Sequence, residues 1–308
     1  KGVHADEGRR VHIDVERDVP RGASEGGGEV FSQHVLAGGL AACQQQVFAA
    51  EQGGQRLLDW PTSQMPDVIH AGYQALMVMA MEAGAEIGGW LGDRQMQSEC
   101  RGALRRLRRH VPDHLRNKQA AAMLVLAGLA DPGKVCRTVI ARGGAEGFST
   151  FYGYYMLEAL AEGGLYDEAL QIISNYWGAM LDLGATTFWE DLNYAHAAGA
   201  ARIDEPVPAG KFDIHAESGA YCYKGLRHSL CHGWASGPTP WLSRHVLGIV
   251  PLEPGCKSVA VRPHLGHLKW AEGTFPTPWG VIRVRHERGA DGKVSTSVSA
   301  PDGVRVVR

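Results

Sequence analysis

The sequence has 308 residues, a formal net charge of −2 and a pI of about 6.7. This length suffices for one large hydrophobic core, or for one domain with a smaller second domain. The near-neutral charge supplies no overall basic field, which argues against a nucleic-acid partner. No apolar run approaches the roughly twenty residues of a transmembrane helix, so no membrane partner is expected.

The six cysteines are spread along the chain without a CxxC pair or a Cys/His cluster at zinc-binding spacing. We therefore predict no metal site and no cofactor. The chain begins with Lys1 rather than methionine and carries no signal peptide. From this we expect a fragment or a processed product, with a cytoplasmic location favoured and the oligomeric state left open.

The first half of the chain is predicted to be helical after an irregular start. Residues 1–29 are charged, glycine-rich and without a periodic pattern. Apolar residues then recur at helical spacing, which predicts helices over 30–52, 67–91, 94–110, 118–130 and 131–142. Asp59 and Trp60 lie in a loop between the first two of these helices.

The second half changes from helices to strands. A helical hairpin is expected over 150–162 and 166–181, because Gly163 and Gly164 suit a helix end, and a last helix should end near residue 247. Beyond residue 249, alternating β-branched and polar residues predict strands over 257–262, 280–287, 293–299 and 303–307. A hairpin turn is expected at Asp291 and Gly292.

These elements predict a mainly α fold. Helical hairpins with glycine- and aromatic-rich loops suggest an (α/α)6 toroid, followed by a small antiparallel β domain. About eight or nine helices can be counted against the twelve of a full toroid, so we expect it to be incomplete at its N-terminus. The predicted division is an irregular segment 1–29, a catalytic barrel 30–248 and a β-sandwich-like domain 249–308. An α-solenoid is the alternative, but no fixed-period repeat is visible.

The segment 184–191 carries the strongest chemical signal. Two hydroxyls, the aromatic pair Phe188 and Trp189, and the carboxylate of Glu190 follow a helical run. Sugar-processing sites need these groups for stacking, hydroxyl recognition and proton transfer. The two aromatic rings should lower the dielectric around Glu190 and raise its pKa, which suits a base near neutral pH. The alternative is a first-turn helix carboxylate, with Asp191 as the capping residue.

Three other segments offer candidate residues. Trp60 next to Asp59 could form a sugar platform, although Asp59 could equally cap a helix. The glycine-flanked loop of His232 and Trp234 could approach a ligand closely, although its histidine could simply satisfy backbone carbonyls. In the segment 147–153, a serine or threonine should cap the following helix, and its aromatic residues could line a cavity.

Two longer segments resemble a known family. Residues 147–191, with GFSTFYG and TTFWED, look like the catalytic core of the bacterial α-L-rhamnosidases of glycoside hydrolase family 78. Residues 229–248, with SLCHGWASGP, and the VAVRP of 259–263 resemble that family's passage into its C-terminal β domain. The resemblance covers roughly 30–308 and is strongest from residue 147 onward.

The resemblance implies an (α/α)6 barrel that removes terminal α-L-rhamnose from glycosides or polysaccharides with inversion. The family's general base falls on Glu190, and its sugar-contacting histidine on His232. Asp59 and Trp60 would line the sugar pocket. From the residues themselves we also expect Trp189 and Trp234 to contact the substrate. The bound partner would be a rhamnose-containing glycoside or oligosaccharide.

One family feature is missing. The general acid of these enzymes lies in an acidic, arginine-containing motif upstream of the Asp-Trp loop, and this motif is not found here. An inverting enzyme needs two carboxyl groups about 6.5–9.5 Å apart, and Asp59 is the one placed candidate for the second. Two other functions therefore stay open. One is a truncated, non-catalytic carbohydrate-binding barrel, and the other is a polysaccharide lyase using Tyr152, Tyr154 and His232.

Overall fold

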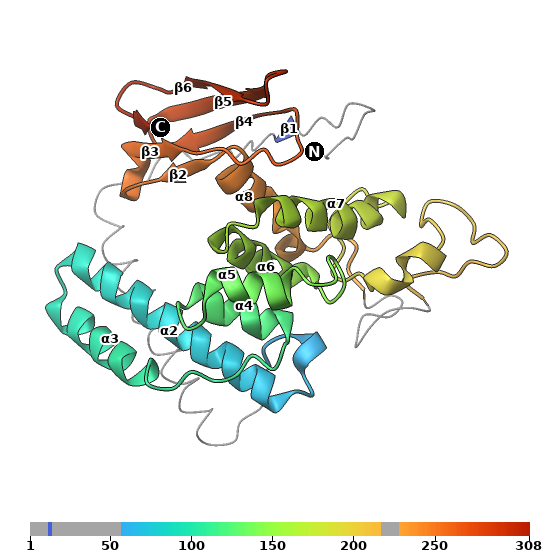
Figure 1. Ribbon diagram of the computed structural model, residues 1–308, viewed down its shortest axis with the longest axis horizontal. Coiled ribbons are helices and arrows are strands. Elements are labelled where there is room, and N and C mark those ends of the chain that lie inside the picture. The colour runs from blue at the N-terminus through green and yellow to red at the C-terminus, as the bar shows by residue number, and fades with distance from the viewer. Residues whose placement is uncertain (1–11, 14–56, 217–227) are drawn as a thin grey trace. The chain divides into compact units, whose positions relative to one another are not determined.

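The computed structural model describes residues 12–13, 57–216 and 228–308 (Figure 1). The helix expected over 30–52 lies outside the described residues, as does nearly all of the irregular segment 1–29. The chain forms two compact units, one of residues 19–142 and one of residues 143–308 together with 1–18. The predicted division into three domains stays a prediction.

In the unit of residues 19–142, the described part, residues 57–142, is helical. Its described elements are η1 (Trp60–Thr62), α2 (Pro66–Leu91), α3 (Arg94–Leu107), α4 (Lys118–Leu126), α5 (Pro132–Val135) and the π-helical η2 (Cys136–Ile140). Helices α2 and α3 form a hairpin around a small core of Met81, Ala85 and Cys100. A Cβ at Gly84 would lie 2.8 Å from the Cys100 sulfur, so glycine permits this close packing.

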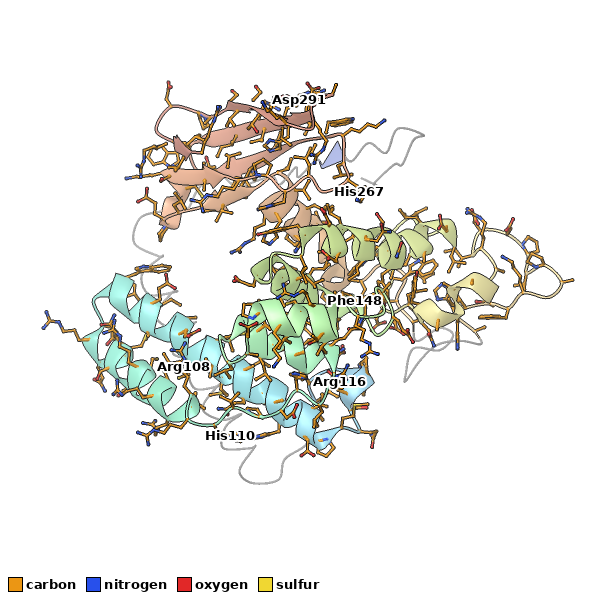
Figure 2. The ribbon with its side chains drawn as sticks, in the orientation of Figure 1. Arg108, His110, Arg116, Phe148, His267 and Asp291 are labelled. Atoms are coloured by element: carbon orange, nitrogen blue, oxygen red, sulfur yellow. The ribbon has the colours of Figure 1, made fainter. Side chains whose placement is uncertain are left out.

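Helix boundaries in this unit differ from the prediction at the C-terminal ends. Helix α3 ends at Leu107 rather than residue 110, and α4 ends at Leu126 rather than residue 130. Gly128 follows α4 with a φ of 63°, which is the left-handed conformation that ends many helices. Arg108 and His110, labelled in Figure 2, lie just beyond the end of α3.

The second unit begins with the predicted helical hairpin, which is confirmed as α6 (Thr150–Glu162) and α7 (Tyr166–Asp182). Phe148, labelled in Figure 2, precedes α6 and packs against Tyr176 of α7 with ring centroids 6.4 Å apart. Short helices follow: η3 (Tyr194–Gly199), η5 (Gly233–Ser236), α8 (Pro238–Trp241) and the π-helical η6 (Leu242–Val246). The last helical stretch thus ends at the predicted place.

Two small sheets complete this unit (Figure 1). One has the order β2 (Ile249–Pro251), β3 (Ser258–Val261), β7 (Arg305–Val307). The other has the order β1 (His12–Ile13), β4 (Trp270–Thr277), β5 (Gly280–Arg288), β6 (Val294–Ser299). Pairings β1–β4 and β3–β7 are parallel and the rest antiparallel. The turn between β5 and β6 contains Asp291 as predicted (Figure 2).

The fold class is confirmed at the level of a mainly helical chain with a small, mostly antiparallel β domain at its C-terminus. The six-hairpin toroid stays a prediction. No helix in the part of the chain that the structure describes is both long and apolar enough to cross a membrane.

Candidate active site

Two loops of the second unit lie side by side and are joined by hydrogen bonds. The backbone N–H of Glu190 donates to the Ser229 carbonyl at 2.9 Å, and that of His232 donates to the Phe188 carbonyl at 2.8 Å. The Thr187 hydroxyl also donates to the Leu230 carbonyl. These bonds hold the 186–191 loop against the 228–232 loop, and so bring together the two segments that the sequence marked for chemistry.

The Glu190 carboxylate is fixed by this pairing. Its Oε2 accepts a hydrogen bond from the Ser229 backbone N–H at 2.9 Å. Its Oε1 lies 4.0 Å from His232 Nδ1, which is too far for a direct hydrogen bond. The two side chains are 16% and 23% exposed, so solvent reaches both. One carboxylate oxygen is therefore anchored while the other faces an imidazole across a short gap.

Thr150 holds the main chain of Glu190. Its hydroxyl donates to the Glu190 carbonyl, and Thr150 is buried at the first residue of α6. Helix capping was expected of a serine or threonine here. Ser149 occupies the N-cap position, but its side chain makes no capping hydrogen bond. Thr150 therefore links α6 to the candidate base instead of capping the helix.

The alternative interpretation of Glu190 as a first-turn helix carboxylate is wrong. No helix begins at Asp191, since residues 191–193 are irregular and the following η3 has Asn193 as its N-cap. The expected capping role of Asp191 is therefore also wrong. Instead, its backbone N–H donates to Nε2 of His228 at 3.3 Å.

Trp189 is fully buried, with 0% of its surface exposed. It packs edge-to-face against His215 with ring centroids 4.4 Å apart. A buried indole has no face to offer a pyranose, so the substrate contact expected of Trp189 is not available in this structure. The buried ring thus lies directly before Glu190 in the chain and packs against His215.

Trp234 lies in η5, directly after the 228–232 loop. It is 54% exposed and stacks on Phe151 with ring centroids 4.7 Å apart and an interplanar angle of 21°. The His232 ring lies 4.7 Å from the Trp234 ring. The two side chains therefore form one surface, on which Trp234 supplies the aromatic part and His232 the polar part.

Asp59 and Trp60 belong to the other unit. Asp59 caps η1, where its Oδ1 accepts from the Trp60 backbone N–H and its Oδ2 from Nε2 of Gln119, both at 2.8 Å. The capping role that the sequence left open is therefore observed. The Trp60 side chain is 37% exposed.

Residues 248–307 and the fold of most of the chain are similar to known proteins. Residues 248–307 match the family model described as the bacterial alpha-L-rhamnosidase C-terminal domain. This stretch is therefore similar to a rhamnosidase C-terminal domain. A search of curated proteins finds no match.

Solved rhamnosidases share the fold of most of the chain. The family 78 rhamnosidase of Bacillus sp. GL1 is 22% identical with a TM-score of 0.61, over 77% of this chain and 25% of that chain. The Aspergillus terreus α-L-rhamnosidase is 16% identical with a TM-score of 0.60, over 75% and 27%. The Streptomyces avermitilis α-L-rhamnosidase, complexed with L-rhamnose, is 19% identical with a TM-score of 0.63, over 89% and 27%.

The resemblance to the family 78 rhamnosidases is thereby confirmed. Residues 248–307 match the family model, and the helical part shares its fold with the solved structures. The chain spans about a quarter of the length of these solved structures. The stretch that matches the family model begins just after η6, in the same unit as the loops of Glu190 and His232.

Proposed function

We propose that this protein is an α-L-rhamnosidase-type glycosidase that removes terminal α-L-rhamnose with inversion, and that Glu190 is its general base. The observation that carries the proposal is the arrangement of the Glu190 carboxylate. One oxygen is fixed by the Ser229 N–H and the other faces His232 across 4.0 Å. A fixed, partly exposed carboxylate of this kind can accept a proton from an attacking water.

The neighbouring side chains would bind the sugar. His232 has a ring nitrogen to exchange hydrogen bonds with a sugar hydroxyl, and the exposed face of Trp234 suits the apolar face of a pyranose. Trp60, in the unit of residues 19–142, stays a proposed sugar contact. Trp189 is proposed as an anchor of the Glu190 loop rather than as a contact.

The general acid is not assigned to Asp59. An acid must donate a proton to the leaving oxygen, whereas both carboxylate oxygens of Asp59 accept hydrogen bonds from donors of its own unit. We propose that Asp59 orders the loop on which Trp60 lies.

The test is the release of nitrophenol from an aryl α-L-rhamnoside by this chain and by its Glu190→Gln variant. We expect kcat to fall by at least about a hundredfold in the variant, because the base is lost while the shape of the side chain is kept. The exposed Glu205 provides the matched control, and Glu205→Gln should leave kcat unchanged.

No turnover by a chain whose circular dichroism shows it to be folded would contradict the proposal for this chain. The missing acid motif makes a non-catalytic carbohydrate-binding barrel the second candidate. That candidate predicts binding of L-rhamnose, measured by calorimetry, without hydrolysis.

A further inference from the structure

Two histidines that the sequence did not single out contact the residues next to Glu190. Nε2 of His228 accepts the backbone N–H of Asp191 at 3.3 Å. Nδ1 of His228 lies 3.3 Å from Nδ1 of His215, and the His215 ring packs edge-to-face on Trp189. The two residues on either side of Glu190 in the chain, Trp189 and Asp191, are thus both held by this histidine pair.

The hydrogen bonds fix the proton positions in the pair. A backbone N–H can only donate, so Nε2 of His228 must carry a lone pair. A neutral His228 then has its proton on Nδ1 and donates it to Nδ1 of His215. A neutral His215 must in turn have its proton on Nε2, a buried atom with no hydrogen-bond partner among the described residues.

The surroundings favour the neutral form of His215. Burial lowers the pKa of this imidazole, and the charge of Asp213 offsets only part of that effect. A proton on both nitrogens of His215 would point its Nδ1–H at the Nδ1–H of His228 and would break the contact. The relay from Asp191 through His228 to His215 therefore requires two neutral rings.

We propose that His215 and His228 are positioning residues for Glu190. They touch the loop rather than the substrate, and they set the place of the Glu190 carboxylate by holding the residues before and after it. The catalytic part of this inference rests on the proposed function, whereas the relay itself stands on the geometry of the described residues.

The relay is tested without reference to activity by nitrogen-15 NMR of the histidine rings in the whole chain at neutral pH. We expect His228 to be the Nδ1–H tautomer and His215 the Nε2–H tautomer. Assignment uses the loss of each signal in a His228→Gln and a His215→Asn variant. A His228 ring protonated on Nε2 would overturn the relay, even if the chain hydrolyses rhamnosides.

The positioning role is tested by paired substitutions. His228→Phe keeps a ring but removes the acceptor for the Asp191 N–H, and should lower kcat by about tenfold with little change in KM. His228→Gln places an amide oxygen near the former Nε2 and should recover most of that loss. Equal kcat in His228→Phe and the parent would overturn the positioning role.

A purely structural role would give a different pattern. Both variants would then lower the melting temperature by similar amounts and leave kcat unchanged. If His228→Phe does not fold, His215→Asn and His215→Phe give the same comparison, since only the first keeps an acceptor near the Nδ1 position. If the parent chain turns over no rhamnoside while the NMR tautomers are as expected, the proposed function fails and the relay stands.

Discussion

Glu190 is held through its main chain as well as through its carboxylate. The buried Thr150 hydroxyl donates to the Glu190 carbonyl, the Ser229 N–H donates to Oε2, and the Glu190 N–H donates to the Ser229 carbonyl. A general base must be placed to within a fraction of an ångström to abstract a proton from a bound water. If Glu190 is the base that we propose, the position of its carboxylate depends on Thr150 and on the main chain of Ser229.

The Thr150 bond gives the first prediction. Thr150→Val has nearly the same shape but leaves the Glu190 carbonyl without this donor, which costs about 1–3 kcal/mol for a buried group. We expect kcat for an aryl α-L-rhamnoside to fall about tenfold. Thr150→Ser keeps the hydroxyl and serves as the control. Equal rates for the valine and serine variants would contradict the role given to this hydroxyl.

At the residue scale, the sequence identified the groups that share one local motif. Glu190, His232 and Trp234 stand in short segments whose composition suits a sugar site. The structure places Glu190 and His232 in the paired loops and Trp234 beside His232, in η5. Trp189 was expected to contact substrate, but the local sequence could not reveal which face of its loop is buried. His215 and His228 had no signal, because each meets the Glu190 loop only in the folded chain.

At the element scale, long periodic segments were predictable and interrupted ones were not. The hairpin α6–α7 was predicted almost to the residue, because apolar spacing and terminal glycines agree there. Strand β4 was not predicted as a strand. Gly273 and Pro276 interrupt its pattern, and its pairing with β5 over eight residues outweighs these weak propensities.

A glycine between the last helix and the first sheet gives the second prediction. Gly248 has a φ of 69°, and a Cβ there would lie 2.2 Å from the backbone carbonyl carbon of Arg262. Gly248→Ala therefore combines left-handed strain with a clash against backbone, and we expect it to lower the free energy of unfolding by more than about 3 kcal/mol.

The matched control is Gly292, in the turn between β5 and β6. It has a φ of 80°, but a Cβ there would meet nothing within 4 Å. Gly292→Ala should lower the free energy of unfolding by only about 1–2 kcal/mol, which is the cost of holding alanine in the left-handed conformation. The measurement is chemical denaturation of both variants. Similar losses of stability in the two would show that the contact with Arg262 does not matter.

At the scale of the whole molecule, buried histidines couple stability to pH. His286 is fully buried in the β domain, where Nε2 donates to the Leu247 carbonyl and Nδ1 contacts the Thr296 hydroxyl. Burial lowers the pKa of His286, as it does for His215 and His264. The unfolded chain therefore binds more protons than the folded chain at mildly acidic pH.

The third prediction follows from the sign of this difference. A lowered pKa in the folded state means that full stability is present above the unfolded value of about 6.5 and is lost as the pH falls below it. Denaturation at a series of pH values should show this loss. His286→Gln keeps a donor for the Leu247 carbonyl but does not titrate, so its stability should depend less steeply on pH. An unchanged slope would contradict the prediction.

The order of helices followed by a C-terminal β domain was predictable from the change of period near residue 249, and the family match at residues 248–307 agrees with it. The closure of the helices into a toroid could not be predicted from the sequence pattern in this way. Closure depends on contacts between segments far apart in the chain, and the chain spans about a quarter of the solved rhamnosidases that share its fold.

We propose that Glu190 activates a water for direct, inverting attack on an α-L-rhamnoside. The most direct measurement is time-resolved proton NMR of the sugar released by this chain, recorded before the anomers interconvert. We expect β-L-rhamnose to form first, because a single displacement by water inverts the anomeric carbon. Release of α-L-rhamnose first would indicate a covalent intermediate and would contradict the role of Glu190 as a general base.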